Sequence, residues 1–162
     1  MSVQIPSYPA SSLSSVLARV ETVVGDAVQR IGNSAKRGGY FCLVEWGPDC
    51  SATICSVRIG APSNGTALRY EQFAREKAWR LVANHGHMSS WQTRDEMAEK
   101  YGGAIRAGKY ILSFSGLPEI EDERAMLSVA VRLGLIPELQ AAAIARTSSN
   151  IGFLEELTAA HA

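Results

Sequence analysis

The chain has 162 residues, of which 46% are hydrophobic and 20% are charged, as expected for one soluble globular domain. The 16 Lys and Arg residues balance the 16 Asp and Glu residues, so the charge gives no reason to expect nucleic acid or an anionic membrane as a partner. No apolar run approaches the roughly 20 residues that span a bilayer, and the N-terminus lacks the basic start and apolar core of a signal peptide, so we expect a cytoplasmic protein.

The first half of the chain predicts a helix, a hairpin and a second helix. Residues 1–10 contain two prolines and are expected to form an irregular arm. Apolar residues recur at steps of three and four over residues 12–32, which predicts a helix. Residues 40–46 and 52–59 are strand-like runs joined by a short Gly-Pro-Asp turn, so we expect them to pair in antiparallel. A second helical stripe follows over residues 66–84.

The second half begins with a loop and continues with a second hairpin. Residues 93–101 predict a short helix, because a threonine suits its cap and acids follow in the first turn. Residues 103–106 and 109–115 predict two strands around an Ala-Gly turn. Pro118 and the acids after it then predict the start of another helix, which ends near residue 133.

This order of elements, α-ββ-α-α-ββ-α, is typical of an α+β fold in which helices cover an antiparallel or mixed sheet. We expect one domain over residues 11–136, followed by a C-terminal helical extension over residues 137–162. Apolar residues on a wide stripe of the first helix and along the extension exceed what a core of this size buries, which favours assembly into a homo-oligomer.

Several short motifs follow one another in a distinctive order. The segment 73–90, FAREKAWRLVANHGHMSS, is followed by a double glycine at 102–103, by a Ser-Gly pair at 115–116, and by Asp122 on a predicted helix. This order resembles the GlcG/HbpS-like haem-binding and haem-degrading domains, in particular their small uncharacterised cytosolic branch. The resemblance implies a profilin-like antiparallel sheet flanked by helices, assembly into homo-oligomers, and haem or iron as the ligand.

Five residues are candidates for binding a cofactor. His85 and His87 form an H-x-H pair that can hold a metal or a haem iron, although His85 can equally pack at the helix end. Lys77 can pair with a carboxylate or with a ligand propionate, or it can lay its stem on the sheet. Ser115 and Gly116 are expected to line a pocket at the strand's end. Alternatively, glycine is needed at position 116 only because the backbone there adopts an unusual angle.

Glu96 and Glu99 form an E-x-x-E pair that a helix would place on one face, which adds them to His85 and His87 as candidate metal ligands. The resemblance implies surface iron binding for such a pair, while a solvated helix face is the plainer interpretation. No His or Asp spacing supports serine catalysis, and three cysteines without C-x-x-C spacing imply no zinc site.

Two hypotheses of function follow. Under the first, the chain binds haem or a related tetrapyrrole, and slow degradation of that ligand stays open. Under the second, it is a non-enzymatic oligomeric structural or interaction module. The absence of a compelling catalytic set favours the second hypothesis. The resemblance adds that small residues are usual before the Ser-Gly pair, where this chain has Tyr110, Ile111 and Leu112, and a bulkier strand there would fill the cavity of that family.

Overall fold

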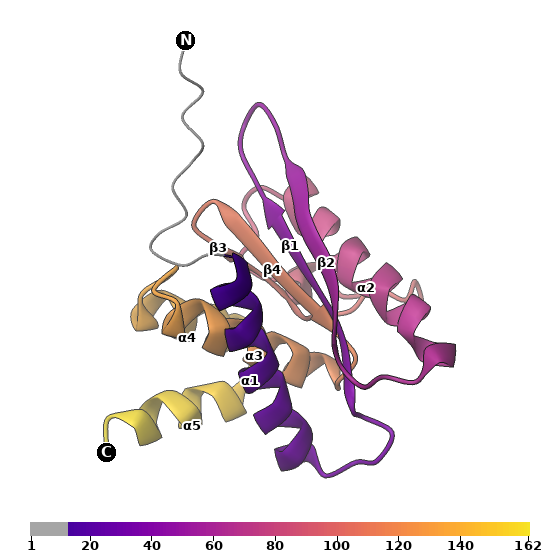
Figure 1. The fold of residues 1–162 in the computed structure, drawn as a ribbon. Coiled ribbons are helices and arrows are strands. Elements are labelled where there is room, and N and C mark those ends of the chain that lie inside the picture. Colours follow the sequence, from indigo (N-terminus) through magenta and orange to yellow (C-terminus); the bar gives the residue numbers. More distant parts are fainter. Residues whose placement is uncertain (1–12) are drawn as a thin grey trace.

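The structure is a computed structural model that describes residues 13–162, so the expected arm over residues 1–10 lies outside the described residues (Figure 1). The described elements are, in chain order, α1 (Leu13–Ile31), β1 (Gly38–Glu45), β2 (Ala52–Gly60), α2 (Asn64–Ala83), the 3-10 helix η1 (Ser90–Thr93), β3 (Ala104–Ala107), β4 (Tyr110–Ser115), α3 (Glu119–Arg132), α4 (Glu138–Thr147) and α5 (Ile151–Ala160). None of the described helices is long and apolar enough to cross a membrane.

The four strands form one antiparallel sheet in the order β2-β1-β4-β3. This confirms the α+β class and both predicted hairpins, within the described order α-ββ-α-ββ-ααα. The two edges of the sheet differ. The outer side of β3 contacts the segment before it: Ile105 forms a bridge with Ser89, and the amide of Arg106 donates to the carbonyl of Met88 at 2.9 Å. β2 pairs only with β1 among the described strands.

Helices cover both faces of the sheet, with α2 on one face and α1 and α3 on the other (Figure 1). Alternate residues of β1 point to opposite faces. Phe41 and Leu43 join the cluster that contains α1 and α3, while Cys42 and Val44 join the cluster beneath α2. Because both faces are buried, the inner strands are apolar along most of their length, which explains the compact apolar runs in the sequence.

Helices α4 and α5 pack against α3 and join the main core. Ile144 and Phe153 are 2% and 1% exposed, and both belong to the same cluster as α1 and α3. At the junction of α4 and α5, Ser148 and Asn150 donate hydrogen bonds to the buried carboxylate of Glu123 on α3. The expected C-terminal extension therefore shares its core with the rest of the chain.

The prediction of a short helix over residues 93–101 is wrong. The backbones of Asp95 and Lys100 exchange two hydrogen bonds, at 2.9 and 2.8 Å, and these close a turn. The side chain of Asp95 also accepts from amides inside this turn, so a residue expected in the first turn of a helix stabilises a different structure. Glu99 has a φ of 53°, outside the helical region. Glu96 and Glu99 therefore do not share a helix face.

Candidate functional site

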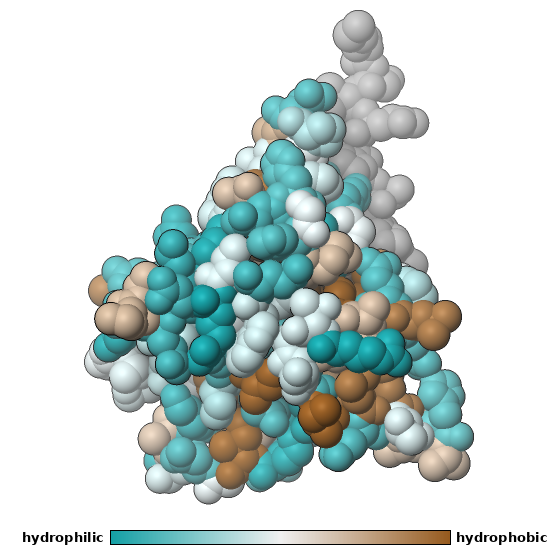
Figure 2. Space-filling view, turned by 180° about the vertical axis from the view of Figure 1, so that it is seen from behind, coloured by the Kyte–Doolittle hydropathy of each residue, from teal (hydrophilic) through white to brown (hydrophobic). Residues whose placement is uncertain are grey.

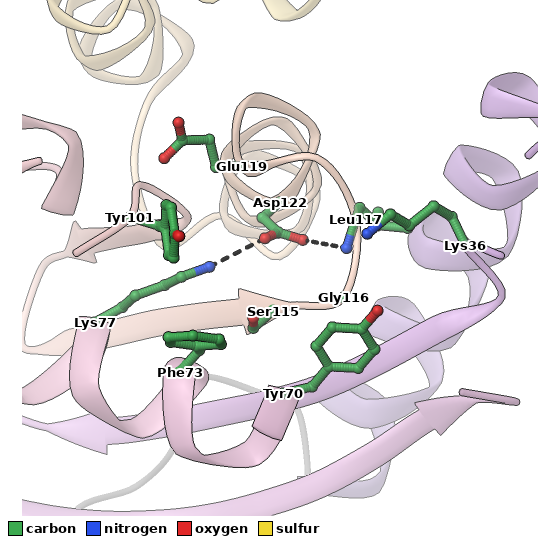
Figure 3. A pocket seen from close by; sticks show the side chains of 10 residues that line it. All are labelled: Lys36, Tyr70, Phe73, Lys77, Tyr101, Ser115, Gly116, Leu117, Glu119 and Asp122. Carbon is green, nitrogen blue, oxygen red and sulfur yellow. Dashed lines mark hydrogen bonds and ion pairs between the residues drawn. The ribbon is translucent and has the colours of Figure 1, made fainter. Parts of the chain in front are cut away.

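A pocket of about 240 Å³ lies where α2, the loop before β3 and the turn from β4 into α3 meet, and it opens to solvent (Figure 3). Three of its side chains are aromatic, four are charged, and the others belong to the strand end and the turn after it. The lining residues are Lys36, Tyr70, Phe73, Lys77, Tyr101, Ser115, Gly116, Leu117, Glu119 and Asp122.

The floor of the pocket is a buried ion pair between Lys77 of α2 and Asp122 of α3. Their charged atoms are 3.0 Å apart, and each side chain is 2% exposed. Lys77 Nζ also donates to the carbonyl of Phe114 at 2.9 Å, and Asp122 Oδ1 accepts from the amide of Leu117 at 2.9 Å. Burial raises the pKa of Asp122 to about 6, while the charge of Lys77 acts in the opposite direction. The pair ties α2 to the start of α3.

Gly103 makes room for this ion pair. Its φ is +123°, a conformation that favours glycine, and a Cβ there would lie 2.8 Å from both Lys77 Nζ and Asp122 Cβ. Three residues meet here that lie far apart in the sequence: Gly103 of the double glycine, Lys77 and Asp122. The structure brings all three together beneath one pocket.

Two backbone segments cross closely at the back wall of the pocket. A Cβ on Gly39 would lie 1.9 Å from the carbonyl oxygen of Ser115, and a Cβ on Gly116 would lie 2.2 Å from that of Gly38. Backbone atoms cannot move aside as a flexible side chain can, so glycine is required at the crossing. The crossing of β1 with the end of β4 places Ser115 and Gly116 in the pocket wall.

Aromatic rings form the mouth of the pocket. Phe73 and Tyr101 meet edge to face, with ring centroids 5.4 Å apart. Tyr70 lies one helical turn before Phe73, and the ammonium of Lys36 is 5.8 Å from the centroid of its ring. Figure 3 shows the three rings around the space in front of the ion pair. An apolar rim with a polar floor is the usual construction of a small-molecule site.

Glu119, the first residue of α3, is held in place at the upper side of the pocket. Its carboxylate accepts hydrogen bonds from the guanidinium of Arg94 and from the amide of Gly102, the latter at 2.9 Å. Arg94 in turn lies over the ring of Trp91, 5.0 Å from its centroid. These contacts fix the loop before β3 against the start of α3, so this wall is built from residues distant in the sequence.

His85 and His87 do not reach this pocket. The helix between Phe73 and its last residue, Ala83, rises by about 15 Å, and both histidines follow that end. His85 is exposed and packs edge-on against Trp46, with centroids 5.8 Å apart, while His87 is half-buried. The predicted cofactor-binding residues are thus divided between two places, with Lys77, Ser115 and Gly116 at the pocket.

The carboxylates of the E-x-x-E pair are committed to exposed ion pairs. Glu96 pairs with Arg94 at 2.8 Å, and Glu99 pairs with Arg69 at 2.9 Å. In the described part of the chain, no group of three or more His, Cys, Asp or Glu side chains is placed to hold a metal ion. The structure therefore does not bring His85, His87 and these two glutamates together.

Sequence reasoning missed part of the pocket. Tyr70 was missed, although it precedes Phe73 by three residues and Lys77 by seven, a spacing that places all three on one helix face. Lys36 and Tyr101 come from loops on opposite sides of the pocket, and no local pattern marks them.

No known family model matches this chain, and neither a curated protein nor a solved structure does. The resemblance to the GlcG/HbpS-like domains therefore rests on the short motifs alone and stays a prediction. The fold and the site define a coarser class, an α+β domain with one antiparallel sheet and a small pocket built over a buried ion pair.

The buried acids of α3 predict how stability depends on pH. Burial raises the pKa of Glu123, against the hydrogen bonds from Ser148, Ser89 and Asn150. An acid whose pKa is higher in the folded chain than in the unfolded chain favours folding at low pH, and this contribution is lost as pH rises through the folded pKa. For Asp122 that window runs from about 4, the unfolded value, to about 6.

We expect the variant Glu123→Gln to unfold at higher urea concentration than the wild type at pH 7.5, and the difference to shrink at pH 5. Gln keeps the shape and stays neutral, so it removes the burial of a charge at high pH. Urea titrations at the two pH values measure this. Glu21→Gln, on the exposed side of α1, is the control and should show no such change. An equal effect of Glu123→Gln at both pH values would contradict the prediction.

Proposed function

We propose that this chain is a binding protein for a small ligand, and that its site is the pocket over the Lys77–Asp122 pair. The observation that carries the proposal is the convergence of α2, the double glycine at 102–103 and the β4–α3 turn on one pocket with a buried, hydrogen-bonded polar floor. A buried ion pair is weak evidence for stability by itself.

The chemistry of the pocket supports binding rather than catalysis. Lys77 Nζ donates to Asp122 and to the Phe114 carbonyl, so the amine is already engaged in hydrogen bonds within the protein. A nucleophile needs a base within hydrogen-bond reach. Among the described residues that line the pocket there is no histidine, and the two carboxylates are already paired with Lys77 and Arg94. The proposal therefore includes no reaction step.

The size of the pocket favours a compact ligand over a tetrapyrrole. A volume of about 240 Å³ lies below the roughly 300–1,000 Å³ that is usual for pockets that bind drug-sized ligands. His85 and His87 also lie outside the pocket. Haem binding stays a prediction, which a haemin titration tests: the Soret band should shift, and the shift should fall in a variant that lacks both histidines.

Assembly into a homo-oligomer and a profilin-like relationship also stay predictions. The larger exposed apolar side chains lie on several elements: Leu68, Trp79, Met97, Leu139 and Ile151. Figure 2 shows hydrophobic side chains in separate groups on the face that it presents, with polar surface between them. Light scattering that gives the monomer mass at working concentration would refute the oligomer, and with it the hypothesis of an oligomeric interaction module.

Saturation-transfer NMR with three single-ring probes, benzoate, benzyl alcohol and benzylamine, tests the proposed site. We expect at least one probe to bind, and Phe73→Ala to weaken its binding about tenfold because the variant removes one wall of the pocket. Leu68→Ala is the matched control, since Leu68 lies on the same helix, is 64% exposed and does not line the pocket. Binding that is unaffected by Phe73→Ala would contradict the proposed site.

A further inference from the structure

The charged groups around the pocket leave one cation over. Glu119 is paired with Arg94, and Asp122 is paired with Lys77. Lys36, which completes the charged lining, forms no ion pair within the part of the chain that the structure describes. Among the described residues that line the pocket, Lys36 is therefore the charged side chain that has no ion-pair partner.

Lys36 is aimed at the interior of the pocket. It lies in the turn between α1 and β1, and its side chain is half-buried. In Figure 3 its ammonium lies beside Leu117, and the hydroxyl of Tyr70 points to the same side. That hydroxyl has no hydrogen-bond partner among the described residues. One side of the pocket therefore presents a cation and a hydroxyl donor, a combination that suits a carboxylate.

The opposite side of the pocket is aromatic. Phe73 and Tyr101 present their rings across from Lys36, and Figure 3 shows the open space between these two sides. A flat ring can stack or meet edge to face there, as aromatic pairs do. A ligand that satisfies both sides has a ring at one end and an anionic group at the other.

We propose that this pocket selects a small aromatic carboxylate, and that Lys36 is the residue that determines the preference for negative charge. This inference rests on the proposed function and adds the chemical class of the ligand. The N-terminus of α3 does not replace Lys36, because its first turn carries Glu119, Glu121 and Asp122, which offset the positive end of the helix dipole. Without Lys36, the remaining charged lining is paired and offers an anion no free partner.

Titration of the full chain with benzoate, benzyl alcohol and benzylamine separates charge selection from binding. The three probes share one ring and differ in charge. We expect benzoate to bind about tenfold more tightly than either of the others, and Lys36→Gln to remove that preference. Lys36→Arg keeps the charge and should keep the preference. Arg37→Gln is the matched control, since Arg37 is the neighbouring cation and does not line the pocket.

The outcomes distinguish this inference from the proposed function. Benzylamine or benzyl alcohol binding as tightly as benzoate would overturn the charge selection and leave the binding site in place. Unchanged benzoate affinity in a folded Lys36→Gln variant, checked by its thermal melting, would overturn the role of Lys36. Binding of none of the three probes to the wild type would overturn the proposed function together with this inference.

Discussion

Replacing Lys77 by Met is expected to lower the free energy of unfolding by about 3–5 kcal/mol at pH 7. The variant leaves the carboxylate of Asp122 buried without its cation, and it also removes the hydrogen bond to the Phe114 carbonyl. Urea unfolding followed by circular dichroism measures the loss. The loss should decrease as pH falls, because a protonated Asp122 no longer needs a cation.

Two further variants separate the ion pair from the packing of the lysine stem. In Lys77→Met/Asp122→Asn the second change removes the unpaired charge and keeps an acceptor for the Leu117 amide, so most of the lost stability should return. Arg75→Met on the same helix is the control. Arg75, whose side chain is 57% exposed, pairs with Glu71, and this surface ion pair should be worth less than about 1 kcal/mol. A loss in Lys77→Met no larger than in the control would show that the buried pair is not needed.

Replacing Gly39 by Ala is expected to destabilise the fold by about 3 kcal/mol or more. The new methyl group would lie 1.9 Å from the Ser115 carbonyl oxygen, and the atoms that it meets are backbone. β1 and the end of β4 would have to separate at the back wall of the pocket. We therefore expect a lower melting temperature and, for any probe that binds the wild type, weaker binding.

The same substitution elsewhere in the chain provides the control. Gly25 lies inside α1, and a Cβ there would meet nothing within 4 Å. Gly25→Ala should raise the stability by up to about 1 kcal/mol, because alanine favours the helix over glycine. Equal melting temperatures for the two variants would contradict the close crossing seen in the structure.

The helices and strands whose apolar residues repeat at a regular spacing were predictable from the sequence. Steps of three and four in α1 and α2 and the compact runs of β1 and β4 reflect which faces are covered, and those faces repeat locally. The turn around Asp95 was not predictable in this way, since an Asp in the first turn of a helix and an Asp that closes a turn use the same side-chain acceptor. Pro118 likewise precedes α3 as its cap residue, where it was expected to be the first helical residue.

The pocket was predictable only where its residues carry a recognisable motif. Lys77, Ser115 and Gly116 lie in such motifs, and all three line it. Lys36 and Tyr101 lie there because the loops that carry them pack against α2 and α3, which no local spacing reveals. The histidines drew attention through their residue type, although a side chain after the end of α2 is too far from its middle to share a site.

The unequal edges of the sheet limit how copies of this chain can join by strand addition. The outer side of β3 is partly occupied by the segment that contains Ser89 and Met88, while β2 has no partner on its outer side among the described strands. Two copies related by a two-fold axis can pair their β2 strands, and each then presents its partly occupied β3 edge outward. Strand addition through β2 would then stop at a closed pair.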